Sequence, residues 1–347
     1  MEHSHGLKSI LSDVYAGIRS AAGITIALSI VIAILATADK GYYIIMNTIV
    51  TGGMWALMAM GLALLFGVMN LANFAHGDFF MVGALTAYFV ATFLGKYASS
   101  HSNTLLSTVA PLVTVFAATI AGSLLGVACE LIVFRPLRKR SREQWVMNVF
   151  ILTLGLSVVL TNGHQLLLGV GFKGIVGYWN LPALSIFQTF ISWDRIFVFL
   201  LATIAISGFW VFMKFSRYGM AIRAVSQDEA GALMLGIDLN RIQILTLAVS
   251  CALASLAGGS LLFMFPAYPT MGLGPLYNSW FVVIVVGMGN VGAAVIGGFL
   301  IALFQVVTTV YIGEGWGFVV PSAFIIIILL VKPSGIFGSP VRGILEQ

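Results

Sequence analysis

Two short stretches of this sequence place polar side chains between long apolar runs, where they could bind or pass a polar solute. In the first, 66–78, two amides, an imidazole and a carboxylate fall within nine residues. They belong to Asn70, Asn73, His76 and Asp78. Because unsatisfied polar groups are costly in lipid, this stretch predicts a broken helix that lines a polar pathway or gate. A plain cytoplasmic turn capped by Asn and Asp is the alternative interpretation.

The second stretch, 286–292, contains G-x-G-x-x-G, a pattern that binds dinucleotides when it joins a strand to a helix. The run that follows, 293–311, is of membrane length and leaves no room for a parallel sheet. The glycines are therefore expected to permit a tight reversal and close helix packing. Asn290 resembles Asn70 and Asn73 in chemistry, which hints that each half of the bundle contributes a broken element. No Cys or His spacing is typical of a metal site, so neither metal nor cofactor is expected.

The composition places these breaks in a membrane protein. Of 347 residues, 60% are hydrophobic and 8% charged, whereas about a quarter are charged in soluble domains. Apolar runs of about 20 residues, enough to cross the hydrocarbon core, recur along the chain. The expected spans are 20–38, 43–66, 75–95, 105–134, 146–168, 193–213, 241–265, 277–289, 291–312 and 317–331. We predict an all-α, polytopic transmembrane bundle of about 8–10 spans with broken or re-entrant segments, forming a single domain over 1–347.

The positions of the basic residues predict the orientation. The net charge of +5 is spread between spans, so it does not indicate nucleic-acid binding. With the N-terminus inside, about 13 Lys and Arg face the cytoplasm and about 4 face outward, as the positive-inside rule requires. Both termini, including a tail at 1–19, are then cytoplasmic. The run ending at 36–38 resembles a signal cleavage site, but an uncleaved first helix is preferred. Glu130 is expected to pair with Arg135 at the inner interface.

The longest polar segment, 214–241, is expected to be a cytoplasmic docking loop. Ser226 is expected to cap a short helix, with Asp228 and Glu229 in its first turn and Gly236 at its end. One face of this helix would carry Ala230, Leu233 and Met234. These small and soft groups suit a groove in a partner protein. A solvated turn between helices is the alternative, and it predicts fewer apolar residues.

Four stretches together resemble a known family. They are 73–78 before an apolar span, 134–138 after one, 223–237, and 286–289. Over about 43–335 the chain is similar to the permeases of branched-chain amino-acid ABC importers, the Liv type. The resemblance implies a bacterial inner-membrane permease that works with a homologous second permease, two cytoplasmic ATPases and an extracytoplasmic solute-binding protein. It makes 226–236 the helix that docks on an ATPase.

The chain has no G-x-x-x-x-G-K-S/T phosphate loop, so a transport subunit rather than an enzyme is expected. The low charge of the spans suits a zwitterionic or neutral solute. Branched-chain amino acids are the first expectation, and urea or short amides the second. A stand-alone proton-coupled transporter using His76, Asp78 and Glu130 is a further alternative. It needs these groups deep in the bundle, whereas the expected spans put Asp78 near the inner boundary. An intramembrane enzyme has no nucleophile–base or metal constellation here.

Overall fold

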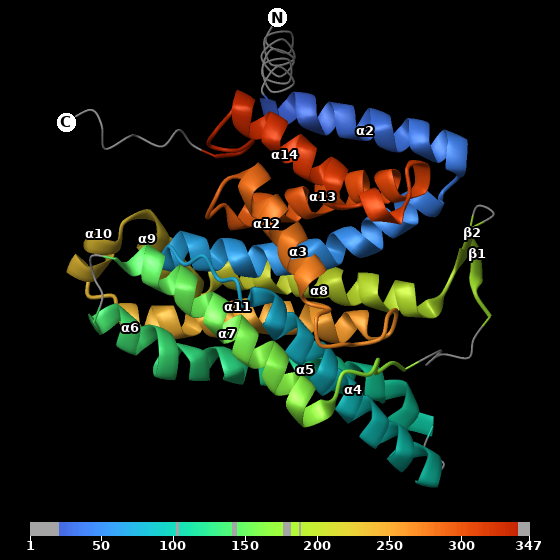
Figure 1. Ribbon diagram of the computed structural model, residues 1–347, viewed down its shortest axis with the longest axis horizontal. Coiled ribbons are helices and arrows are strands. Elements are labelled where there is room, and N and C mark those ends of the chain that lie inside the picture. Colours follow the sequence, from blue (N-terminus) through green and yellow to red (C-terminus); the bar gives the residue numbers. More distant parts are fainter. Residues whose placement is uncertain (1–20, 102–103, 141–143, 176–181, 187–188, 339–347) are drawn as a thin grey trace, which may run out of the picture.

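The chain is a bundle of long apolar helices in its computed structural model, which describes residues 21–101, 104–140, 144–175, 182–186 and 189–338 (Figure 1). The tail predicted at 1–19 lies outside the described residues. Nine helical stretches in the described part are long and apolar enough to cross a membrane. They overlap with α2 (Ala21–Lys40), α3 (Tyr43–Met69), α4 (His76–His101), α5 (Thr104–Cys129), α7 (Trp145–Leu168), α8 (Trp193–Phe215), α11 (Leu239–Leu261), α13 (Val291–Tyr311) and α14 (Val319–Val331). The predicted polytopic helical bundle is confirmed.

Shorter elements complete the bundle. They are the π-helical η1 (Glu130–Phe134), α6 (Arg135–Arg140), α9 (Arg217–Gln227), α10 (Glu229–Met234), α12 (Leu273–Val286) and the 3-10 helix η2 (Glu314–Trp316). A hairpin that the sequence did not predict pairs β1 (Leu184–Ile186) antiparallel with β2 (Thr189–Ile191). We call the end of the bundle that carries α6, α9 and α10 the loop end, and the end with β1 and β2 the hairpin end (Figure 1).

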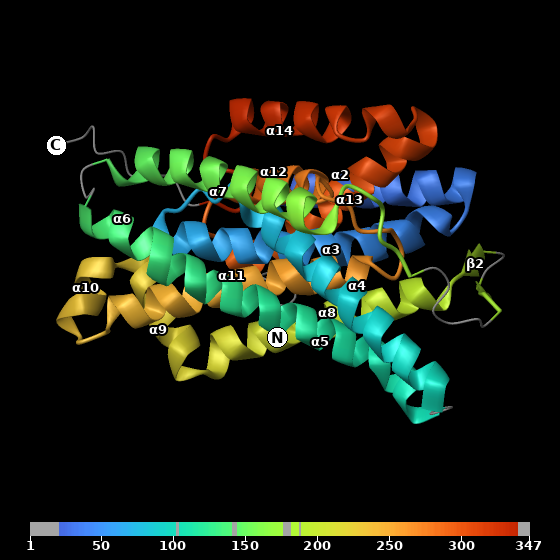
Figure 2. The same cartoon turned by 60° about the horizontal axis from the view of Figure 1, so that its bottom comes forward.

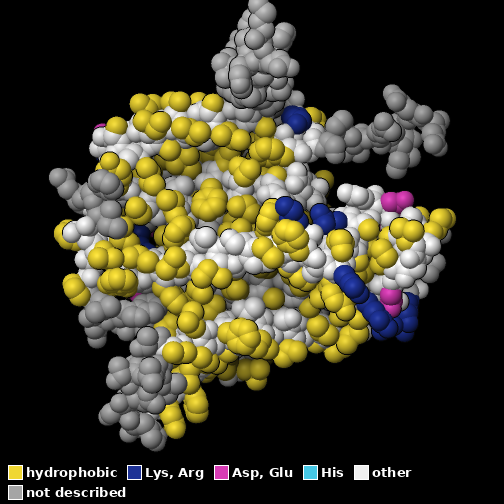
Figure 3. Space-filling view, turned by 180° about the vertical axis from the view of Figure 1, so that it is seen from behind, with side chains coloured by type: hydrophobic (Ala, Val, Ile, Leu, Met, Phe, Trp, Pro, Cys, Tyr) yellow, Lys and Arg dark blue, Asp and Glu magenta, His cyan; other side chains and the backbone are white. Residues whose placement is uncertain are grey.

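Helices α3 and α11 run through the middle of the bundle, while α2, α7, α8 and α14 lie outside (Figures 1 and 2). Most of α3 is buried, which suits a helix that is apolar on every side. Small residues let its neighbours approach closely: a methyl group at Gly298 of α13 would touch the backbone of Ala56 in α3. The outer surface is mostly hydrophobic, and Lys and Arg gather mainly towards the loop end (Figure 3).

Two three-helix units, α3–α4–α5 and α11–α12–α13, repeat the same contacts. Helix α3 packs on α13 as α5 packs on α11, and α4 packs on α11 as α12 packs on α3. The units run in opposite directions, since α3 ends at the loop end and α11 begins there (Figure 1). The architecture is therefore an inverted repeat, a common plan for transporters.

The first helical turns of α4 and α12 meet inside the bundle. A methyl group at Gly77 would strike the Gly272 carbonyl, and one at Gly272 would strike the Gly77 carbonyl. In the repeat, the break before α4 thus corresponds to the start of α12. The α12–α13 turn, which carries Asn290, corresponds in this repeat to the α4–α5 connection and not to the break that carries Asn70 and Asn73.

Candidate functional site

The chain re-enters the bundle after α3. Asn70 ends this helix with a left-handed backbone (φ 47°), and its N–H donates to the Phe66 carbonyl at 3.1 Å. Asn tolerates this conformation better than most residues. Residues 70–75 then run back into the bundle without helical structure until α4 begins at His76. The predicted broken helix is present, and we call 70–75 the re-entrant segment.

Helix α7 covers the re-entrant segment with polar contacts. The Trp145 indole N–H donates to the carbonyl of Met69 at 3.1 Å, and the Thr153 hydroxyl donates to that of Ala72 at 3.2 Å. The rings of Phe74 and Phe150 meet edge to face, with centroids 5.0 Å apart. These contacts give polar partners to backbone that has left the helix. The role of α7 was not predicted, and the hydroxyl and indole groups inside its apolar sequence are the signal that could have indicated it.

Asn73 and His76 are fully buried where the re-entrant segment meets α4. Asn73 Oδ1 accepts from the backbone N–H of Ala75 at 3.0 Å, and His76 Nε2 lies 3.1 Å from the Met58 carbonyl oxygen. Asn73 Nδ2 and His76 Nδ1 have no hydrogen-bond partner within the described part of the chain. Both residues therefore fix the break in place and do not line an open cavity.

Asp78 lies deep in the bundle, and the prediction that it sits near the inner boundary is wrong. Met58, the partner of His76, lies 11 residues before the end of α3, about 16 Å along a helix that rises 1.5 Å per residue. The re-entrant segment carries the start of α4 to that depth. There Asp78 Oδ1 accepts a hydrogen bond from the Thr161 hydroxyl of α7 at 2.7 Å.

The second break is the tight turn between α12 and α13. Gly287 and Gly289 have φ values of 101° and 82°, which favour glycine. Asn290 caps α13, because its Oδ1 accepts from the Ala293 N–H at 3.1 Å. A methyl group at Gly67 of α3 would stand 3.3 Å from the Gly289 carbonyl oxygen, so the turn lies beside the end of α3. The predicted reversal and close packing are confirmed.

An open cavity of about 1730 Å³ lies where these two breaks meet at the loop end. Its wall includes Asn70, Trp145, Lys214, Arg223, Gly289 and Asn290. Of the predicted pathway residues, Asn70 and Asn290 line this cavity, whereas Asn73, His76 and Asp78 do not. The wall is mainly apolar, with backbone and amide groups from the breaks among its polar atoms. Such a surface can pass a small solute that carries both apolar and polar groups.

Asn290→Ala will lower the free energy of unfolding by about 1 kcal/mol, the usual cost of a lost N-cap. Asn290→Asp keeps the acceptor oxygen at the start of α13 and places a negative charge where the helix dipole favours it. We expect the apparent thermal midpoint of the purified protein to fall for Asn290→Ala and to recover in Asn290→Asp. Equal midpoints for these two variants would contradict the capping role.

The short helix predicted within 214–241 is present as α10, but Ser226 does not cap it. Ser226 lies inside α9, and its hydroxyl donates to the Arg223 carbonyl at 2.8 Å. The residue at the N-cap position of α10 is Asp228, and Glu229 begins the helix. Helix α9 was missed, although Ser216 caps it by accepting from the N–H of Gly219 at 2.8 Å. A Ser three residues before a Gly was too weak a signal to predict it.

Gly236 ends α10, as predicted. Its φ is 80°, and its N–H donates to the Leu233 carbonyl while that of Ile237 donates to the Ala232 carbonyl. This pair of bonds is a Schellman motif. The predicted apolar face is open: Ala230 is exposed, and Leu233 and Met234 are 53% and 89% exposed.

A family model described as branched-chain amino acid transport system / permease component matches residues 44–330. The chain belongs to this permease family. Its relatives include the high-affinity branched-chain amino acid transport system permease LivH of Salmonella typhimurium, 27% identical over 85% of this chain and 94% of LivH. The corresponding permease protein BraD of Pseudomonas aeruginosa is 28% identical over 85% of this chain and 95% of BraD. No solved structure matches this permease.

Proposed function

We propose that this permease is the membrane-spanning subunit of an ATP-driven importer of branched-chain amino acids. The observation that carries the proposal is the family match over most of the chain, joined to a largely apolar cavity at the loop end. A branched-chain amino acid is a zwitterion with an aliphatic side chain. The apolar wall suits the side chain, and the amides of Asn70 and Asn290 suit its polar groups.

The loop end is the cytoplasmic end in this proposal. Basic residues of the described chain gather there, in α6, α9 and their neighbours, as the positive-inside rule requires of a cytoplasmic face. Both termini then lie in the cytoplasm, in a bacterial inner membrane. The exposed face of α10 docks on one of two ATPase subunits. A homologous second permease and an extracytoplasmic solute-binding protein complete the transporter.

The proton-coupled alternative is not favoured. The depth of Asp78 meets one of its requirements, yet the carboxylate faces α7 while Glu130 forms an ion pair with Arg138 in the segments that follow α5. The three groups therefore do not form a continuous relay. The family match also favours transport powered by partner ATPases.

The proposal is tested with the permease purified together with its partners and reconstituted in liposomes. We expect ATP-dependent uptake of labelled leucine, isoleucine and valine that requires the binding protein, with no competition from urea or short amides. Uptake of urea in their place would overturn the substrate assignment. Uptake by the permease alone under a proton gradient, without ATP, would overturn the importer.

A further inference from the structure

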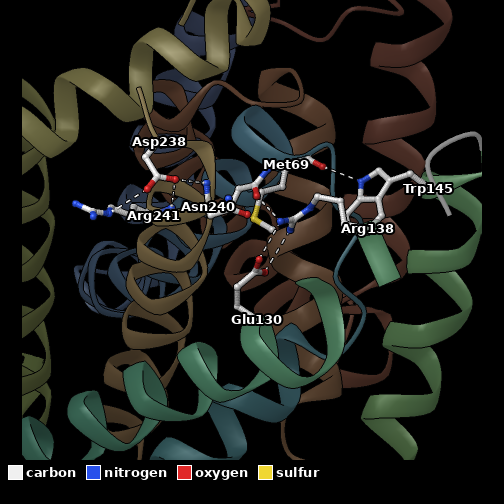
Figure 4. A network of polar contacts seen from close by, with 8 residues as sticks. Met69, Glu130, Arg138, Trp145, Asp238, Asn240 and Arg241 are labelled. Carbon is white, nitrogen blue, oxygen red and sulfur yellow. Dashed lines mark hydrogen bonds and ion pairs between the residues drawn. The ribbon is translucent and has the colours of Figure 1, made fainter. Parts of the chain in front are cut away.

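A buried ion pair joins the segments that follow α5. Glu130 in η1 is 1% exposed, and its two carboxylate oxygens accept from Arg138 of α6 at 3.0 and 3.3 Å (Figure 4). In a regular α-helix, residues eight apart are separated by about 2.2 turns and point in different directions. The wider π-helical turn takes up this offset and brings both side chains to one side. The expected pair between Glu130 and Arg135 is therefore replaced by one with Arg138.

Arg138 also contacts two other elements, α11 and α7, and α7 in turn contacts the end of α3. Its Nη1 donates to the side-chain oxygen of Gln243 in α11, and its guanidinium lies 5.1 Å from the centre of the Trp145 ring at the start of α7. Trp145 in turn donates to the carbonyl of Met69, the last residue of α3 (Figure 4). A planar guanidinium is suited to hold a carboxylate and an aromatic face at once.

One end of this chain of contacts leads to the docking loop. Gln243 lies in the second turn of α11, and Asp238 caps that helix by accepting from the N–H groups of Asn240 and Arg241 at 3.0 and 3.3 Å (Figure 4). Asp238 follows Gly236, which closes α10, by only two residues. A shift of α10 is therefore passed to the first turns of α11 and to Gln243.

The other end of the chain of contacts reaches the cavity. Met69 precedes Asn70, which begins the re-entrant segment, and both Trp145 and Asn70 belong to the cavity wall. Because Glu130 is buried, moving Arg138 away would leave an unpaired charge in the bundle, at a large cost in free energy. A displacement of Gln243 thus moves Arg138, Trp145 and the start of the re-entrant segment together, or breaks the bond to Gln243.

We propose that Arg138 and Trp145 are positioning residues that couple the docking loop to the re-entrant segment at the cavity wall. This inference rests on the proposed ATP-driven function. Trp145 also lines the cavity, but the role proposed for both residues is exerted through Gln243 and Met69 and not through a contact with solute or nucleotide. Their role is to make ATP hydrolysis productive, so they set the number of solute molecules moved per ATP.

The test measures uptake and ATP hydrolysis in the same proteoliposomes of the complete transporter. Trp145→Phe keeps an aromatic ring beside Arg138, although a smaller one, and removes the donor to Met69, while Arg138→Lys keeps a charge beside Glu130 and loses the planar fork. For both variants we expect ATP hydrolysis within about twofold of wild type and uptake per ATP lowered about tenfold, in the usual range of coupling between sites.

The control is Arg241→Gln, which breaks a neighbouring but exposed pair with Asp238 (Figure 4). Exposed ion pairs contribute little to stability, so we expect Arg241→Gln to keep the wild-type uptake per ATP. If both variants keep the wild-type uptake per ATP, the coupling role is overturned. Equal losses of uptake and of ATP hydrolysis would also overturn it, because a merely structural defect lowers both together. A wild-type transporter without ATP-driven uptake would instead overturn the proposed function, and this inference with it.

Discussion

Gly77→Val will reduce the amount of folded permease in the membrane to below about a tenth of wild type. The added side chain would strike the carbonyl group of Gly272 and lie against Leu276. The two atoms nearest to the added carbon, the oxygen and carbon of the Gly272 carbonyl, are backbone atoms inside the bundle, so the clash cannot be relieved without shifting α4 or α12. Overpacking of a well-packed core costs about 1–3 kcal/mol and sometimes more. The yield of monodisperse protein after detergent extraction measures the effect.

Gly95→Val is the matched control for this prediction. Gly95 lies on the same helix, and a methyl group there would meet nothing within 4 Å. The substitution, the intrinsic helix propensity and the expression conditions are then the same. We expect Gly95→Val to remain within about twofold of wild type. Similar yields for both variants would show that the two backbones are not in contact.

Gly236→Val will abolish ATP-driven uptake, by more than about tenfold, while leaving the permease folded in the membrane. A φ of 80° is strained for a β-branched residue, although the space around Gly236 is open. The end of α10 must rearrange to relieve this strain, which displaces the exposed side chains of Leu233 and Met234 from the docking position. Co-purification of the ATPase subunits and uptake into proteoliposomes measure the loss.

Gly41→Val separates the docking role from backbone strain. Gly41 joins α2 to α3 at the hairpin end with a φ of 81°, and its surroundings are equally open. The strain introduced is therefore the same, but it falls at the opposite end of the bundle. We expect this variant to bind the ATPases and to transport as wild type does. A comparable loss of uptake in both variants would contradict the role of α10.

The spans could be predicted from sequence because hydropathy reports directly on the length of apolar runs. The expected spans 193–213 and 291–312 correspond to α8 and α13 within two residues. The end of α10 was also predictable, because a glycine after a short helix is a local signal. The two breaks could be predicted from Asn70 and Asn290, because amide side chains are rare inside apolar sequence.

What the sequence could not predict depends on contacts between distant segments. Nothing in 71–75 distinguishes a turn at the surface from a segment that returns into the bundle, so the depth of Asp78 was misjudged. The partner of Glu130 depends on a π-helical turn that hydropathy does not detect. Whether His76 lines a cavity or is packed against Met58 is decided by how α4 meets α3.

The short length of α12 has a consequence for how the chain inserts into the membrane. Its 14 residues extend about 21 Å, less than the hydrocarbon core, and its first turn lies beside Gly77 at the depth of Met58. A helix that starts midway across the bilayer would expose unpaired N–H groups to lipid if it were released alone. We therefore expect α12 to leave the translocon only after α3, α4 and α11 have assembled a place for it, so that its insertion is a late folding step and not an independent one.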